Sequence, residues 1–200
     1  MSHTDLFHLA LALVGGVVIA ATTGLRAFLP LFALGVAGRF GWWPADEHMK
    51  WLQSTPALVA LGLATVLEIA GDKIPVVDHL LDAIGTVVRP VAGVAGSFVV
   101  LQAFPTPWGQ IVALVLGGLT LGVHGIKAKT RLGSSIATMG TANPALSFIE
   151  DLLALFGTVF ALLLPFLGLF VALVAVGLLV RTMGKPGKVA SPPPAPRAAG

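Results

Sequence analysis

Apolar runs far longer than the core helices of soluble domains occupy most of this chain. Two of them, residues 6–38 and 148–180, extend over 33 residues each and hold one and two charged residues. A helix that crosses the roughly 30 Å hydrocarbon core of a bilayer needs about 20 apolar residues. The whole chain is 56% hydrophobic and 10% charged, whereas soluble domains carry about 25% charged residues. We therefore predict an all-α integral membrane protein, for which the lipid bilayer is the expected partner.

Several functional classes are disfavoured by what the sequence lacks. The chain has no cysteine, which excludes disulfides, thiolate metal ligands and thiol catalysis. Its basic residues are not interleaved with aromatic ones, so the net charge of +3 indicates membrane topology rather than nucleic-acid binding. No dinucleotide, phosphate-loop or zinc-protease motif occurs. We predict no enzyme, no catalytic residue and no cofactor, and leave metal binding open.

Interruptions in the apolar runs divide the chain into helical elements. Each long run exceeds one perpendicular crossing and falls short of two, so we predict a broken helix around residues 22–26 and a hairpin near Pro165. Three further spans are predicted over residues 56–70, 91–104 and 109–126, of which the second is short unless its helix begins earlier, near Val76. The small, weakly polar residues 132–147 indicate a buried re-entrant element. The expected fold is a polytopic membrane helical bundle of about six helical elements, some broken or re-entrant, over residues 1–181.

Basic residues near the apolar segments predict the orientation. Lys127, Lys129 and Arg131 follow one span, and Arg181 begins the basic stretch before the proline-rich tail, residues 182–200. Because basic residues accumulate in cytoplasmic loops, we expect both regions in the cytoplasm, with the tail disordered. The expected location is the cell membrane, specifically a bacterial inner membrane, with a cytoplasmic C-terminus.

The two halves of the chain contain similar segments. Residues 77–87 can be laid over residues 149–159 without a gap, so that an acid, Leu-Leu and Gly-Thr-Val coincide. This similarity raises an internal duplication as a hypothesis, since duplicated halves with a polar site at their interface are typical of transporters. If it holds, the two acidic segments face each other.

A charged run interrupts the apolar pattern between residues 68 and 89. Four of the nine acidic residues of the chain lie there, although a charge at membrane depth costs about 2.5 to 3.5 kcal/mol on insertion scales. On a helix with 100° per residue, Asp78, Asp82 and Arg89 share one face. Two interpretations fit this face. It belongs to an amphipathic helix in the membrane interface, with its acids in water, or it lines an aqueous cavity. Arg89 is two turns from Asp82, so we expect its partner on another element.

Other charges also allow two interpretations. Glu68, Asp72 and Lys73 either join a site or mark a helix end that reaches water. Arg26 either pairs with a distant carboxylate or an anion, or extends to the interface. Glu150-Asp151 either faces the site or complements a helix dipole. The candidate ion- or substrate-binding residues are Arg26, Glu68, Asp72, Lys73, Asp78, Asp82, Arg89, Arg131, Asn143, Glu150 and Asp151.

The combined motifs resemble a known family. They are Thr23–Pro30 (TGLRAFLP), Asp72–Asp78 (DKIPVVD) with Glu68 and Asp82, Arg89-Pro90, Lys129-Thr130-Arg131, and Asn143-Pro144 with Glu150-Asp151. Over residues 8–181 the chain resembles the bacterial membrane family catalogued as domain of unknown function 4126. The resemblance implies a multi-span membrane protein and no assigned activity.

Two functions from different classes fit these observations. The first is a small ion- or proton-coupled transporter or channel, in which the acids bind a cation or relay protons and the arginines act as counter-charges. A homodimer would suit so short a chain, with close helix contact at Gly117-Gly118 and Gly122. The second is a non-catalytic scaffold or accessory protein whose buried charges are structural. An enzyme acting on lipid comes third, because no catalytic motif supports it.

Overall fold

The chain folds as a bundle of helices. The computed structural model describes residues 3–42 and 47–183, and no strand occurs within these ranges. In chain order the helices are α1 (His3–Leu25), α2 (Phe28–Arg39), the 3₁₀ helix η1 (Glu47–Gln53), α3 (Thr55–Gly71), α4 (Pro75–Val100), the 3₁₀ helix η2 (Leu101–Ala103), α5 (Trp108–Thr138), α6 (Asn143–Leu163) and α7 (Pro165–Met183). The all-α prediction is confirmed, with seven α-helices in the described residues against about six helical elements predicted.

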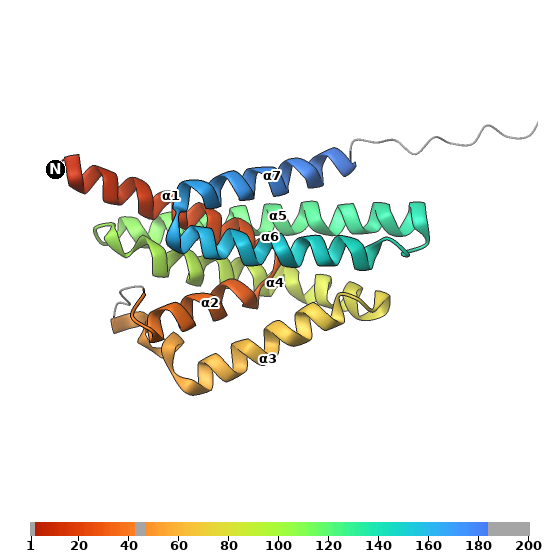
Figure 1. Ribbon diagram of the computed structural model, residues 1–200, viewed down its shortest axis with the longest axis horizontal. Helices are drawn as coiled ribbons and strands as arrows, with labels where there is room; N and C mark the ends of the chain where they lie inside the picture. The colour runs from red at the N-terminus through yellow and green to blue at the C-terminus, as the bar shows by residue number, and fades with distance from the viewer. Residues whose placement is uncertain (1–2, 43–46, 184–200) are drawn as a thin grey trace, which may run out of the picture.

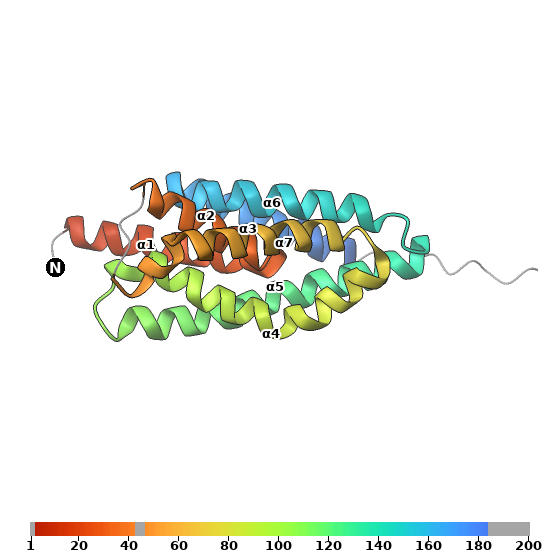
Figure 2. The same ribbon diagram turned by 90° about the horizontal axis from the view of Figure 1, so that it is seen from below.

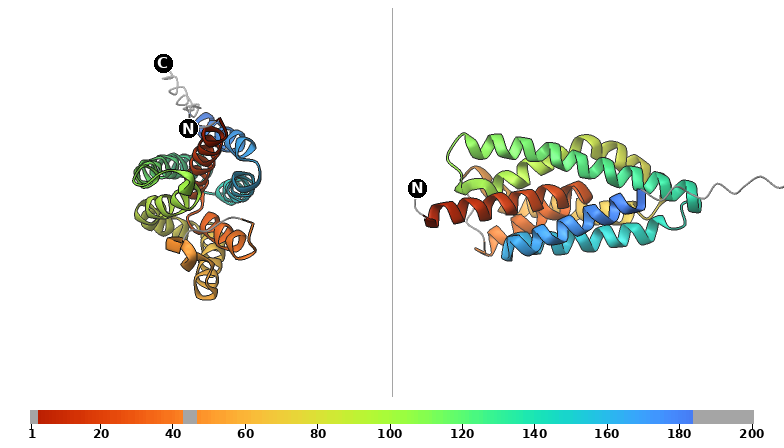
Figure 3. Two further views of the ribbon diagram at one scale, coloured as in Figure 1. Left: turned by 90° about the vertical axis from the view of Figure 1, so that its left-hand side faces the viewer. Right: turned by 90° about the horizontal axis from the view of Figure 1, so that it is seen from above.

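The α-helices lie along the long axis of the molecule (Figure 1). Seen from one end, α1 lies between α4 and α5 on one side and α6 and α7 on the other (Figure 3). Helices α4 and α5 run side by side (Figure 2), whereas α3 lies at the outside of the bundle. The apolar core forms around α1, where Val18, Ile19 and Leu25 are at most 2% exposed.

Four helices are long and apolar enough to cross a membrane. They cover His3–Leu25, Val77–Ala103, Trp108–Thr138 and Asn143–Leu163 and contain 21 to 31 residues each. Many of their large apolar side chains face outward, including Val87 at 69% and Leu114 at 68% exposure. Apolar side chains on the outside of a bundle are what a lipid solvent favours. The fold therefore supports a multi-pass membrane protein.

The predicted break in the first apolar run is confirmed. Helix α1 ends at Leu25 and α2 begins at Phe28, and α2 then runs back towards the end of the bundle where α1 starts (Figure 1). Pro30 lies in the first turn of α2, where a missing N–H breaks no intrahelical hydrogen bond. The break is buried, because Arg26 is 0% and Ala27 is 2% exposed.

The predicted hairpin near Pro165 is also confirmed. Helix α6 ends at Leu163 and α7 begins at Pro165, and the two helices lie side by side (Figure 1). Proline disfavours helical backbone at the residue before it, so the helix ends there. The same rule applies at Ile74, which has extended backbone (φ −109°, ψ 113°) immediately before α4 begins at Pro75.

The structure differs from the prediction in residues 132–147. Instead of a buried re-entrant element, these residues form the end of α5, a turn at residues 139–142 and the start of α6. Met139, in the turn, is 94% exposed. Small, weakly polar residues continue a helix as readily as they fill a buried loop, so composition alone does not separate the two. An internal duplication is not shown by this arrangement, and most of the predicted tail lies outside the described residues.

Candidate functional site

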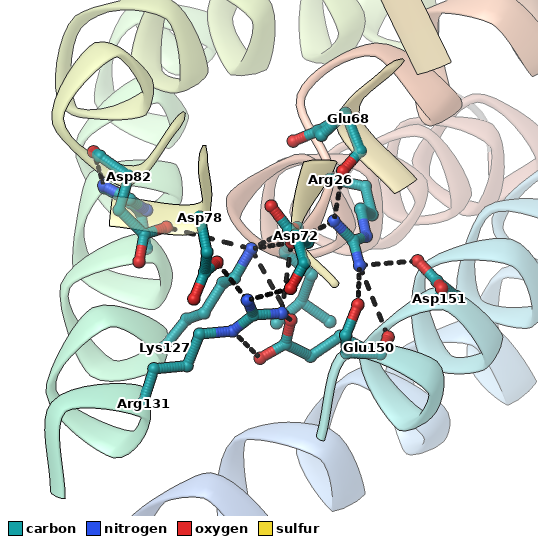
Figure 4. A network of polar contacts seen from close by, with 12 residues as sticks. Arg26, Glu68, Asp72, Asp78, Asp82, Lys127, Arg131, Glu150 and Asp151 are labelled. Carbon is teal, nitrogen blue, oxygen red and sulfur yellow. Dashed lines mark hydrogen bonds and ion pairs between the residues drawn. The ribbon is translucent and has the colours of Figure 1, made fainter. Parts of the chain in front are cut away.

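A network of buried charges lies where the break between α1 and α2 meets the α3–α4 turn, α4, α5 and α6 (Figure 4). We call it the charge network. Its acids are Glu68, Asp72, Asp78, Asp82, Glu150 and Asp151, and its cations are Arg26, Lys73, Arg89, Lys127 and Arg131. Eight of these eleven side chains are at most 4% exposed. The sequence predicts ten of the eleven as site residues.

Arg26 extends from the helix break into the charge network. One guanidinium nitrogen bonds Asp72 Oδ2, and the other lies 2.6 Å from Asp151 Oδ1. That second nitrogen also donates to Ser147 Oγ at 2.9 Å. The side chain is 0% exposed, so the interpretation of Arg26 as an interfacial side chain is wrong. The prediction that it pairs with a distant carboxylate is confirmed.

Glu68 holds the broken backbone in place from the neighbouring helix α3. Its Oε1 accepts a hydrogen bond from the Ala27 amide at 3.0 Å, and Oε2 accepts one from the Phe28 amide at 3.3 Å. These amides belong to the start of α2, where backbone donors have no intrahelical partner and a negative charge is favoured. Arg89 Nη2 donates to the same carboxylate at 3.2 Å. Glu68 is 3% exposed, so α3 does not end in water at this residue.

Asp72 connects three cations at the centre of the charge network. Its Oδ2 contacts Arg26, Lys127 Nζ at 3.0 Å and Arg131 Nη2 at 3.1 Å. The Asp72 side chain is 0% exposed, and its Oδ1 has no hydrogen-bond partner among the described residues. The α3–α4 turn thus inserts one carboxylate among cations from two other parts of the chain.

Arg131 joins the two acidic segments that the sequence comparison aligned. It pairs with Asp78 through Nη1 and with Glu150 through Nε at 3.3 Å and Nη2 at 2.5 Å. The two-nitrogen contact with Glu150 is the bidentate geometry that favours arginine at carboxylates. Asp78 and Glu150 therefore share one partner, although the duplication from which we expected the two acidic segments to face each other is not shown. Asp78 is 1% exposed, which excludes the interfacial helix with its acids in water.

Lys127 occupies a position that corrects the orientation argument. Lys127, Lys129 and Arg131 are predicted to lie in a cytoplasmic loop, but all three lie within α5. Lys127 and Arg131 are at most 1% exposed. Residues four apart share a helix face, so Lys127 and Arg131 both turn inward while Lys129 stays exposed. The orientation rule counts basic residues along the chain and does not separate those on the buried face of a helix from those on its exposed face.

Arg89 has more partners than predicted. As expected, one partner, Glu68, lies on another element. A second is Asp82 on the same helix, with Nη1 at 3.5 Å from Oδ1, so the prediction that this distance excludes direct pairing is wrong. The long arginine side chain covers the two turns, and it passes over Gly85, where an added Cβ would lie 3.2 Å from the Arg89 Nε.

His124 contacts this part of the charge network and was not predicted. Its Nδ1 lies against Arg89 Nη1, and its Nε2 lies 3.0 Å from the Asp82 carbonyl. Since an arginine nitrogen can only donate, Nδ1 accepts and Nε2 carries the proton. His124 and Lys127 are three residues apart and therefore share one face of α5. This spacing is the sequence pattern from which His124 could have been predicted as a neighbour of the site.

The edge of the charge network differs from its centre. Lys73 Nζ lies 3.2 Å from Asp151 Oδ2, and these side chains are 40% and 15% exposed. Asn143 lies apart from the network, donating to Ser135 Oγ at 2.8 Å. Among the described residues, no group of three His, Asp or Glu side chains is placed to hold a metal ion, because cations separate the acids.

Comparison with known families agrees with the resemblance noted from the motifs. Residues 13–185 match the family described as a domain of unknown function, DUF4126. The chain belongs to the DUF4126 family. The DUF4126 match covers every residue of the charge network. Comparison with curated proteins and with solved structures gives no match.

Proposed function

We propose that this DUF4126 protein is a small ion- or proton-coupled transporter or channel, and that the charge network is its coupling site in a closed arrangement. The observation that carries the proposal is the burial of eight charged side chains. Each buried ion costs several kcal/mol in desolvation, and apolar replacements of buried ion pairs are often neutral or stabilising. Stability alone is therefore a weak reason for such a site. Charged groups inside a membrane domain are typical of ion and proton paths.

The broken helix supports the same role. The Leu25 carbonyl ends α1, the amides of Ala27 and Phe28 begin α2, and both sets of backbone groups contact network side chains. Interrupted helices whose ends meet charged groups at membrane depth are a recurring feature of transporters. We also propose that α2 re-enters the bilayer rather than crossing it, since it contains 12 residues and a crossing needs about 20.

Charge balance gives the site capacity for one more positive charge. Six acids face five cations when Lys73 is included, and Lys73 is the most exposed of the eleven. A network with one excess carboxylate favours uptake of a proton or a monovalent cation. The described cavities, of about 180, 350 and 410 Å³, are lined by other residues, which is consistent with a closed state.

A second candidate is a non-catalytic scaffold whose charges lock the helices together. The observation in its favour is that single cations connect several elements: Arg131 alone bonds the α3–α4 turn, α4 and α6. Both candidates are non-catalytic. In a transporter or channel the charge network takes up and releases a proton or a cation, whereas in a scaffold its ion pairs stay unchanged.

The assembly and location are part of the proposal. A homodimer would use Gly118 and Gly122 on α5, since a Cβ added at either meets open space, whereas Gly117 is already packed against Val94. We propose a bacterial inner membrane with the C-terminus in the cytoplasm. With Lys127 and Arg131 buried, this orientation rests on Arg181 and the basic tail.

Flux through proteoliposomes tests the proposal. The purified protein, reconstituted with an internal pH dye, should dissipate an imposed pH or K⁺ gradient faster than empty vesicles. Asp78→Asn should abolish this flux while the protein still inserts and elutes as wild type, and Glu47→Gln, at an exposed acid, should leave flux unchanged. A wild-type protein without flux for H⁺, Na⁺ or K⁺, combined with a large loss of folded protein in Asp78→Asn, would favour the scaffold instead.

A further inference from the structure

The ammonium group of Lys127 lies in a cage of oxygen atoms. Its Nζ is 3.0 Å from Asp72 Oδ2, 3.2 Å from the Leu25 carbonyl, 3.5 Å from Glu150 Oε2 and 3.9 Å from Asp82 Oδ1. We call these four oxygens the cation cage. They come from the end of α1, the α3–α4 turn, α4 and α6, and Figure 4 shows Lys127 reaching from α5 into the space between them.

The cation cage has the composition of an ion site rather than of one ion pair. A main-chain carbonyl at the C-terminal end of a helix carries partial negative charge, and carbonyls at a helix break are known ligands for monovalent ions in transporters. The side chain of Lys127 is 0% exposed, so its charge is shielded from water by these oxygens. Asp72 contributes a second, unpartnered oxygen in the same buried side chain.

The dimensions of the cation cage select the class of ion. First-row metals, magnesium and calcium bind oxygens at about 2.0 to 2.6 Å, well inside the 3.0 to 3.9 Å observed here. This agrees with the absence of a metal-binding group among the described residues. Because these oxygens surround an ammonium nitrogen, the cage fits a monovalent cation of similar size, ammonium or K⁺.

Lys127 differs chemically from the other buried cations of the charge network. Arg26, Arg89 and Arg131 each end in a broad planar guanidinium, whereas Lys127 ends in a compact ammonium on a flexible four-carbon stem. Asp82 is the cage carboxylate nearest to solvent, with 13% of its side chain exposed against 0% for Asp72 and 3% for Glu150. The cation cage is therefore closest to water on its Asp82 side, 3.9 Å from Nζ.

We infer that the cation cage is a binding site for K⁺ or ammonium, and that Lys127 is its tethered occupant. In the exchange, the Lys127 ammonium leaves the cage on its flexible stem with its proton and its charge, and one monovalent cation takes its place. The charge within the cage is unchanged. This inference rests on the proposed transport function and names its substrate class.

A cation-dependent stability measurement tests the cage directly. Lys127→Ala removes the tether and leaves the four oxygens, and Lys129→Ala, at the exposed position two residues on, is the matched control. Thermal midpoints are measured in detergent at constant ionic strength in KCl, NH₄Cl or N-methyl-D-glucamine chloride. We expect Lys127→Ala to be destabilised in the bulky cation and to regain several degrees, saturably, in K⁺ or ammonium. Wild type and Lys129→Ala should not respond.

A second variant makes the result independent of a general folding defect. Lys127→Ala/Asp82→Asn removes one carboxylate with the tether, so it should be more stable than Lys127→Ala in the bulky cation and respond less to K⁺. The inference is overturned if Lys127→Ala has the same midpoint in all three salts or is not recovered even in K⁺. Cation rescue without wild-type flux would keep the site and refute transport. Wild-type flux without rescue would keep transport and refute the cage.

Discussion

Replacing Arg131 with methionine should be among the most destabilising changes in the charge network. It removes the sole ion-pair partner that the described residues offer to Asp78, which is 1% exposed. Glu150 and Asp72 both keep Lys127 as a partner. The loss of stability in Arg131→Met therefore comes mainly from Asp78, whose buried carboxylate is left without a cation.

The expected magnitudes follow from this asymmetry. Breaking a buried ion pair from one side costs about 3–5 kcal/mol, which is the expected loss for Arg131→Met. Asp78→Asn should cost only about 1–2 kcal/mol, because Arg131 retains its bidentate contact with Glu150 and loses one charge-assisted hydrogen bond. In the double variant the stranded charge no longer exists. The two changes should therefore couple by about 2 kcal/mol, within the range for residues in direct contact.

Equilibrium unfolding in detergent with added denaturant, followed by circular dichroism, measures these values. Lys129→Met is the control, since it places the same side chain on the exposed face of the same helix and should change stability by no more than about 0.5 kcal/mol. A loss below about 1 kcal/mol for Arg131→Met, or a double variant whose loss equals the sum of the single losses, would refute the assignment of Asp78 as the stranded charge.

Two further predictions concern packing and the helix break. Gly117→Ala should destabilise the bundle by about 1–3 kcal/mol, because the new Cβ would lie 2.5 Å from Val94 Cγ2. Gly133→Ala, on the same helix, meets open space and should be neutral or stabilising by up to about 1 kcal/mol in the same unfolding assay. Equal effects of the two changes would contradict this packing. Glu68→Gln keeps one acceptor for two backbone donors and should accelerate hydrogen exchange at Phe28, and unchanged exchange would show that the carboxylate does not hold the start of α2.

The elements of the fold were predictable where backbone chemistry marks them. Pro165 ends a helix for steric reasons, and the Thr-Thr-Gly stretch before Arg26 interrupts an apolar run, so both breaks were visible in the sequence. Residues 132–147 were not, because small side chains suit a helix end as well as a buried loop. The contact that holds the start of α2 was not visible either, because the Glu68 carboxylate that accepts from the Phe28 amide is 40 residues away along the chain.

The candidate site was predictable as a set of residues and not as a set of contacts. Arg26 stood out as an isolated charge, but its partner Asp72 is 46 residues away. Helical periodicity relates residues within one helix and cannot predict a contact between residues so far apart in the chain. Lys127 was misassigned because the orientation rule counts basic residues by sequence neighbourhood. The helix-face argument that identified Asp78 and Asp82 applies equally to His124, Lys127 and Arg131, and it would have grouped them.

The order of the charges along the chain has a consequence for biosynthesis. Arg26 leaves the ribosome long before its partner Asp72. Arg131 follows two of its partners, Asp72 and Asp78, and waits only for Glu150. The network closes only when the first turns of α6 have been made. Until then the nascent chain holds unpaired charges that bind water more strongly than lipid. We therefore expect insertion of the helices to precede their assembly, with the arrival of Glu150 as the step that commits the bundle to its final packing.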